Sequence, residues 1–213
     1  MADIFREVDE ELQQEKAAKL WNRYGSWVIA AAVAIVLAVA GNVGWKQWRA
    51  QAQAERAAQY ASAASLLDEG KPRDAANAFA ALADGADNGY ATMARLSQAA
   101  ALAEAGDTEA AVAAYEALAT DGTAEPYAGL ARLRAVRLQV GATDSETLRT
   151  MLAPVLEPDS PWRALARETE ATIALAAGDR DGAVTIFKAL ADAPDVPTAL
   201  RTRATEMVRA LGG

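Results

Sequence analysis

The feature that most constrains the fold is a motif that occurs three times and superposes without gaps. The copies read Gly70-KPRDAANAFAALA, Gly106-DTEAAVAAYEALA and Gly178-DRDGAVTIFKALA. In each copy alanine follows the glycine by five residues, an aromatic residue follows it by nine, and Leu-Ala follows it by twelve and thirteen. The first two glycines are 36 residues apart and the last two are 72 apart, so the spacing predicts a fourth unit near residue 142.

The motif predicts two antiparallel helices joined at the glycine of every unit. Glycine supplies the left-handed residue that ends the first helix, and the alanines allow the two helices to approach closely. Asp107 and Asp179 directly follow turn glycines and are predicted to cap the second helix. The aromatic residue fills the space between neighbouring units, which must stack because no unit buries its apolar face alone. We therefore expect an all-α solenoid of about four helical hairpins.

The degraded unit and the end of the chain fit the same scheme. After Gly141 an apolar helical pattern continues through Leu148, Leu152 and Val155, with its register slipped relative to the other units. Residues 196–211 are predicted to form a capping helix that closes the solenoid. Its apolar side consists of Leu200, Ala204, Met207, Val208 and Leu211.

A second constraint is an uncharged segment near the N-terminus. No side chain between Arg23 and Lys46 carries a formal charge, and at about 1.5 Å per residue this helix spans roughly 30 Å, the thickness of a bilayer core. Trp27 and Trp45 lie near its two ends, at the depth that tryptophan prefers. The sequence predicts three segments: a charged tail at 1–23, a transmembrane signal-anchor helix at 24–46 and the repeat domain at 47–213.

The sequence leaves several properties of this segment open. Ala38-Val39-Ala40 resembles a signal-peptide cleavage site, but apolar character continues beyond it, which favours an uncleaved anchor. Basic residues flank both sides, so the positive-inside rule does not fix the orientation. Small and polar residues indicate either a docking face for another membrane helix or simple composition: Ala30, Ala34, Ala38, Gly41, Asn42 and Gly44. In the tail an apolar stripe indicates either a docking helix or a solvated extension: Ile4, Val8 and Leu12.

The composition excludes most catalytic chemistry. The chain has no cysteine and no histidine, which removes thiol nucleophiles, imidazole acid–base catalysis and Cys or His metal sites. Neighbouring carboxylates on wet helix faces do not make an acid–base pair, so a hydrolase that uses carboxylates alone is the remaining enzymatic alternative. A net charge of −8 disfavours nucleic-acid binding. We expect no enzyme activity, cofactor, metal site, nucleic-acid partner or small-molecule substrate.

Helical repeat domains bind partners along the face formed by the first helix of each pair. Positions ten and three residues before each turn, counted from residue 142 in the degraded unit, place eight side chains on that face: Tyr60, Leu67, Leu96, Ala103, Arg132, Gln139, Glu168 and Leu175. They predict a groove that is apolar at one end and charged at the other, suited to a peptide or a partner helix. The alternative is that several of them are buried between units.

The repeat resembles the tetratricopeptide repeat, in which the second helix follows the pattern Gly-x4-Ala-x3-Tyr/Phe-x2-Ala/Leu. The resemblance covers residues 50–195, although the usual Trp of the first helix is absent. The order of parts, together with residues 11–21, resembles the YfgM-like family of ancillary SecYEG translocon subunits. That resemblance implies a bacterial inner-membrane protein with a cytoplasmic N-terminus and a periplasmic repeat domain, in contact with translocon subunits and periplasmic chaperones.

Two functions are compatible with these features. The first is a membrane-anchored scaffold for protein–protein interaction at the Sec translocon, which recruits or hands substrates to periplasmic chaperones. The second is a cleaved, soluble periplasmic holdase, or a coordinator of envelope assembly or cell division. Both assign binding rather than catalysis to the repeat domain.

Overall fold

The computed structural model describes the backbone of residues 2–85, 88–120 and 122–213; the side chains of residues 1–17, 20, 28, 31, 32 and 88 lie outside this description. The chain divides into two units, Met1–Glu55 and Arg56–Gly213. Within the described backbone there are nine α-helices and no β-strand, only an isolated bridge between Val140 and Thr143. The all-α prediction is confirmed.

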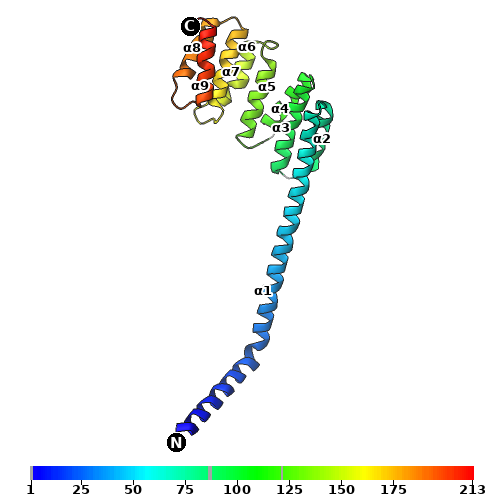
Figure 1. The fold of residues 1–213 in the computed structure, drawn as a ribbon, viewed down its shortest axis with the longest axis vertical. Coiled ribbons are helices and arrows are strands. Elements are labelled where there is room, and N and C mark those ends of the chain that lie inside the picture. Colours follow the sequence, from blue (N-terminus) through cyan, green and yellow to red (C-terminus); the bar gives the residue numbers. More distant parts are fainter. Residues whose placement is uncertain (1, 86–87, 121) are drawn as a thin grey trace. The chain divides into compact units, whose positions relative to one another are not determined.

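Helix α1 runs across both units, and the other helices belong to the second. Their bounds are α1 Ala2–Asp68, α2 Pro72–Gly85, α3 Asn88–Glu104, α4 Thr108–Thr120, α5 Tyr127–Gln139, α6 Ser145–Leu156, α7 Arg163–Ala176, α8 Arg180–Asp192 and α9 Thr198–Ala210. Figure 1 shows α2 to α9 as a row of neighbouring helices. The end of α1 packs with α2, α3 with α4, α5 with α6 and α7 with α8, and α9 closes the row. The second unit is thus the predicted solenoid of four hairpins and a capping helix.

Three of the four turns share one pattern of hydrogen bonds. At Gly106 φ is +79°; its N–H donates to the carbonyl of Ala103, and the next N–H donates to the carbonyl of Leu102. The same pair of bonds is present at Gly70 and Gly178. Together they satisfy two carbonyls at the end of the first helix and require a left-handed residue, which glycine adopts without steric cost.

The third hairpin, between α5 and α6, has a longer turn. The two N–H groups that follow Gly141 both donate to the carbonyl of Gln139. The capping residue Asp144 comes three residues after this glycine, whereas Asp107 and Asp179 come directly after theirs. The carboxylates of Asp107 and Asp179 each accept a hydrogen bond from the backbone N–H three residues later, which confirms the predicted caps. The predicted slip in register is therefore an insertion of two residues in the turn.

When the units are aligned on the capping residue, the core positions of α6 coincide with those of the other second helices. Four, eight and eleven residues after the cap, the buried side chains are Ala111, Tyr115 and Leu118 in α4, and Leu148, Leu152 and Val155 in α6. In α2 and α8 these positions hold alanine, phenylalanine and leucine, as in the motif. Helix α6 therefore has two leucines in place of a small and a large residue, which keeps the combined volume similar.

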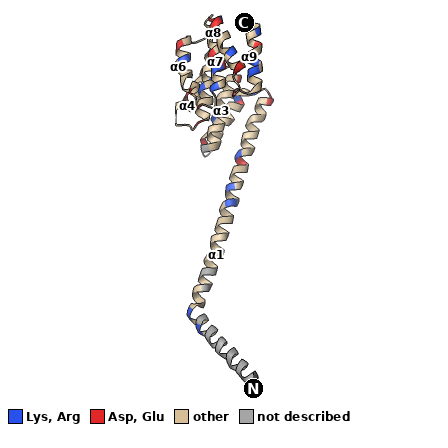
Figure 2. Cartoon of the chain, turned by 90° about the vertical axis from the view of Figure 1, so that its left-hand side faces the viewer, with Lys and Arg blue, Asp and Glu red and all other residues tan. Residues whose placement is uncertain are grey.

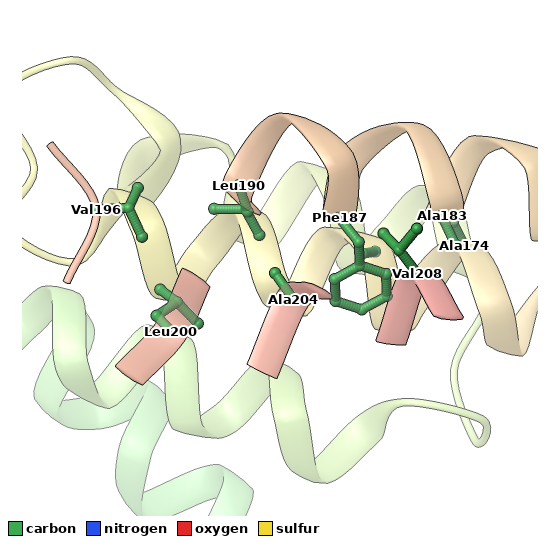
Figure 3. Packing of buried hydrophobic residues seen from close by; sticks show 9 residues of the cluster. Ala174, Ala183, Phe187, Leu190, Val196, Leu200, Ala204 and Val208 are labelled. Atoms are coloured by element: carbon green, nitrogen blue, oxygen red, sulfur yellow. The ribbon is translucent and has the colours of Figure 1, made fainter. Parts of the chain in front are cut away.

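The capping helix has the apolar side that the sequence predicts. Phe187 and Leu190 of α8 pack against Leu200, Ala204 and Val208 of α9 in one cluster of buried residues (Figure 3). Ala204 is 1% exposed, because its small side chain lets the two helices approach closely.

The predicted transmembrane segment, residues 24–46, lies within α1 and is the uncharged part of that helix in Figure 2. Its large apolar side chains are exposed, among them Ile35, Val36 and Leu37 at 64–66%. No helix among the described residues combines the length and the apolar character of a membrane span, so the structure does not support the predicted transmembrane helix.

Two further predictions on this part of the chain are not decided by the structure. The apolar stripe of the tail, Ile4, Val8 and Leu12, lies outside the residues whose side chains are described. The segment boundaries predicted at residues 23/24 and 46/47 fall inside α1 and stay predictions.

Candidate partner-binding groove

The odd-numbered helices form the inner face of the second unit. Helix α3 contacts α5, α5 contacts α7 and α7 contacts α9, whereas within the described ranges none of α2, α4, α6 and α8 contacts another of that group. Helices that touch their second neighbours lie on the concave side of a curved row of repeats. The inner face is thus formed by the first helix of each pair, as predicted for the groove.

A first pocket on this face lies between α3, α5 and the start of α7, and we call it the α3–α5 pocket. Its volume is about 450 Å³, within the roughly 300–1,000 Å³ of typical ligand sites. It is lined by Ala100, Ala103, Tyr115, Leu130, Leu133, Arg134, Arg137, Leu138, Trp162 and Leu165. The pocket is an apolar hollow with two guanidinium groups in its wall.

Trp162 lines the α3–α5 pocket and lies against α5 at a glycine. The indole Nε1–H of Trp162 donates to the carbonyl of Pro126 at 2.7 Å. A Cβ at Gly129 would lie 2.9 Å from the indole ring and 2.9 Å from the carboxylate of Glu125. The absence of a side chain at Gly129 therefore lets the indole lie against α5.

Tyr115 and Arg134 are two neighbouring polar residues in the lining of the same pocket. Tyr115 is 1% exposed, and burial raises the pKa of its hydroxyl above the ordinary 10.0, while the nearby positive charge of Arg134 acts in the opposite direction. The hydroxyl is therefore protonated at neutral pH. Arg134 itself is exposed on α5.

A second pocket adjoins the first through Arg137, which lines both, and we call it the α7–α9 pocket. Its volume is about 550 Å³. It is lined by Arg137, Val140, Glu168, Thr169, Thr172, Phe187, Arg203 and Met207. The two pockets together are the inner groove, which runs from α3 to α9.

Glu168 of α7 joins the two sides of the α7–α9 pocket. Its carboxylate accepts hydrogen bonds from Arg137 of α5 at 3.0 Å and from Arg203 of α9 at 2.9 Å. Arg137 also donates from Nε to the hydroxyl of the buried Thr169 at 2.8 Å. The hydrogen bond with Glu168 raises the pKa of Arg203 above its ordinary value, so Arg203 stays charged throughout the neutral range.

The inner groove is positively charged in an acidic chain. Helix α5 carries three arginines and no acidic residue, and two of them, Arg134 and Arg137, line the groove, while the whole chain has a net charge of −8. Helix α9 carries three arginines and one glutamate. The outer helix α4 has two glutamates and no basic residue. The inner helices α5 and α9 therefore carry a net positive charge, and the outer helix α4 carries a net negative charge.

Half of the side chains predicted for the groove pack into the core instead of lining a pocket. Tyr60, Leu67, Leu96 and Leu175 are half-buried against core clusters between helices. The Tyr60 hydroxyl is also 2.7 Å from the hydroxyl of Ser97, and its ring centroid is 5.1 Å from that of Phe79.

The other predicted groove residues divide between the pockets and the side of α5 that faces α4. Ala103 lines the α3–α5 pocket and Glu168 lines the α7–α9 pocket. Arg132 donates to the carbonyl of Ala119 at 3.1 Å, and Gln139 donates to Glu116 at 3.3 Å, so both lie toward α4. No observation here tests whether these side chains bind a partner, and that assignment stays a prediction.

Sequence reasoning missed Arg134, Arg137, Leu138 and Trp162. The positions in α5 were counted from residue 142, but the turn glycine is Gly141. A shift of one residue along a helix changes the direction of the selected side chain by about 100°. Counting three back from Gly141 selects Leu138, which lies in the pocket, in place of Gln139, which does not. The run of arginines in α5 without an acid was the second available signal.

The small residues predicted as a docking face within the uncharged segment lie on α1. All six are exposed: Ala30, Ala34, Ala38, Gly41, Asn42 and Gly44. Their role in docking stays a prediction.

The comparisons with known proteins agree with the repeat architecture. A helical repeat of this kind, with an inner groove along its first helices, is typical of protein–protein interaction modules. Residues 18–207 match the family described as tetratricopeptide repeat-like domain, and the chain belongs to this family. No curated protein matches the chain significantly, and neither does any solved structure.

Proposed function

We propose that this protein is a scaffold that binds a segment of another protein in its inner groove. The observation that carries the proposal is the pair of adjoining, largely apolar pockets on the inner face, which share Arg137. Peptides and amphipathic helices bind such grooves through apolar anchors and a few polar contacts. The family supports this, because the tetratricopeptide-like repeat is a non-catalytic interaction fold.

The proposal predicts that capture of partners depends on position. A photo-crosslinking residue in place of Leu138, in the α3–α5 pocket, should capture a discrete partner from cells that express the full chain. The same residue in place of Ala113, which is exposed on the outer helix α4, is the control and should capture little. Equal capture from the two positions would contradict the proposal.

We also propose, from the resemblance to YfgM-like proteins, where this scaffold works. Residues 24–46 attach it to a bacterial inner membrane, with the N-terminus in the cytoplasm and the repeat domain in the periplasm. There it is an ancillary component at the Sec translocon that hands substrates to periplasmic chaperones. The support is the uncharged sequence between Arg23 and Lys46, with Trp27 and Trp45 near its ends, and the exposed apolar side chains of α1.

Thiol labelling tests the attachment, because the chain has no natural cysteine. Ala18→Cys lies before the segment, and Ala142→Cys lies in the exposed turn before α6. In intact spheroplasts an impermeant maleimide should label only Ala142→Cys, and carbonate washing should leave the protein with the membranes. Release by carbonate would favour the soluble periplasmic holdase or the envelope-assembly coordinator, and labelling at both positions would contradict the orientation.

A further inference from the structure

We infer that the inner groove selects an acidic, amphipathic segment of a partner protein, with an apolar side chain in the α3–α5 pocket and a carboxylate on Arg134 and Arg137. This inference rests on the proposed function and adds the chemistry of the partner to it. The argument comes from the shape of the pocket, from the state of the two arginines and from the charge of the surrounding chain.

The pocket accepts an apolar anchor. Its walls are side chains such as Leu130, Leu138 and Trp162, and its volume of about 450 Å³ holds an aromatic or leucine side chain together with adjoining backbone. Burying such an anchor removes apolar surface from water on both partners, which favours binding.

Arg134 is available to an acidic ligand. It is exposed in the pocket wall, and none of the ion pairs recorded for the described residues involves it. Its recorded neighbour is the neutral Tyr115 hydroxyl, which does not compensate a positive charge. A carboxylate beside a guanidinium forms charge-assisted hydrogen bonds, which are stronger than neutral ones.

The charge of Arg137 is partly neutralised by Glu168, and a ligand that occupies both pockets lies next to Arg137. One of its terminal nitrogens contacts Glu168, but 43% of its side chain is exposed and it lines both pockets. Glu168 is in turn shared with Arg203, so one carboxylate stands between two guanidinium groups. The network therefore keeps a net positive charge, and a ligand that lies along both pockets passes it.

The combination of an apolar pocket and positive charge favours a peptide over other anionic ligands. A nucleic acid or inorganic phosphate supplies negative charge but no aliphatic side chain for a hollow lined by leucine and tryptophan. An amphipathic acidic segment supplies both at helical spacing. The negative outer helix α4 and the net charge of −8 repel such a segment elsewhere, which adds orientation to the contact.

The experiment measures fluorescence anisotropy of a labelled amphipathic peptide with Leu and Phe on one helical face and Glu on the other, titrated with the full chain. A control peptide has Lys in place of every Glu. The Glu peptide should bind, with an affinity that decreases as the salt concentration increases. The Lys control peptide should bind with at least tenfold lower affinity. Arg134→Gln should weaken binding of the Glu peptide about tenfold, the loss expected for one charge-assisted hydrogen bond.

Two further variants keep the test decisive. Among the described residues that line the groove, Glu168 is the one carboxylate, and Glu168→Gln should tighten binding of the Glu peptide several-fold. Arg149→Gln is the matched control, because Arg149 lies on α6, outside both pockets, and should leave binding unchanged. Circular dichroism checks that each variant is folded.

The outcomes separate this inference from the proposed function. Equal binding of the two peptides, or equal losses for Arg134→Gln and Arg149→Gln, would overturn the acidic preference. If Leu138 still captured a partner in cells, the scaffold proposal would stand and only the acidic preference would fail. Tight binding of inorganic phosphate or of anionic vesicles in competition with the Glu peptide would also overturn the inference, because it would show charge recognition without the apolar anchor.

Discussion

At the scale of single residues, the turn glycines set where each hairpin folds back. Gly106 combines a φ of +79° with two hydrogen bonds to the end of α3. Any L-residue with a Cβ is strained in this conformation by roughly 1–2 kcal/mol. The identity of the residue is therefore fixed by backbone geometry rather than by packing, since no heavy atom lies within 4 Å of the position a Cβ would take.

This leads to a prediction on stability. Gly106→Ala should lower the free energy of unfolding by about 1 kcal/mol, because alanine pays the cost of the left-handed region. The control is Gly89→Ala in the first turn of α3, where φ is not positive and an added Cβ also meets no atom within 4 Å. That change should be neutral or stabilising by up to ~1 kcal/mol. Urea unfolding followed by circular dichroism measures both, and an equal loss for Gly89→Ala would refute the explanation.

Glycine has a different role at Gly129. There the helix is regular, and the side chain is missing because the Trp162 indole occupies the space. The sequence alone did not separate the two kinds of glycine, because one is fixed by its own φ and the other by a residue 33 positions later.

At the scale of secondary-structure elements, α6 shows how the repeat tolerates a degraded unit. Its leucines at 148 and 152 replace the alanine and the aromatic residue of the other second helices, and both are buried. The positions are one helical turn apart on the same face, so a larger side chain at one is matched by a smaller one at the other. Helix α6 thus keeps the combined side-chain volume of the two positions but not the residue types of the other units.

The matching of volumes predicts coupling between the two sites. Leu148→Ala should destabilise by about 2–5 kcal/mol through a cavity, and Leu152→Phe by about 1–3 kcal/mol through overpacking. The double variant restores the alanine and aromatic pair of the other units and should cost at least ~1 kcal/mol less than the sum. A double-mutant cycle in urea measures the coupling. Strict additivity would mean that the two side chains do not share one space.

The uncertainty of helix boundaries limited the prediction of which residues line the groove. The periodicity of the first helices selected residues on the inner face, and two of them, Ala103 and Glu168, line the pockets. In α5 an origin that was one residue late turned the predicted face by about 100° and exchanged Leu138 for Gln139. A helix boundary read from sequence to within one or two residues is enough for a fold but too coarse for the lining of a pocket.

At the scale of the whole second unit, long-range ion pairs connect helices that the repeat pattern treats as equivalent. Glu168 pairs with Arg137, 31 residues before it, and with Arg203, 35 residues after it. Its side chain is only 14% exposed, so solvent weakens these contacts less than those of surface pairs. The network ties α5, α7 and α9 together and gives the inner groove its residual positive charge.

The sequence by itself determined the repeat, the four hairpins, the turn glycines, the caps at Asp107 and Asp179 and the closing helix. Each of these depends on local spacing: a period of 3.6 residues, a φ that only glycine adopts freely, or a carboxylate beside the first turn of a helix. Such features are encoded within a few residues of one another and are legible without a structure.

Only the tertiary structure decided which side chains line the inner groove and how they are charged. Trp162 reaches Pro126, Arg137 reaches Glu168 and Thr169, and four predicted groove residues turn into the core, all through contacts between helices that are distant in sequence. The packing angle and the rotation of each helix set these contacts, and they result from the fit of many side chains at once. A local pattern contains neither quantity, so the lining of the inner groove became visible only in the assembled helices.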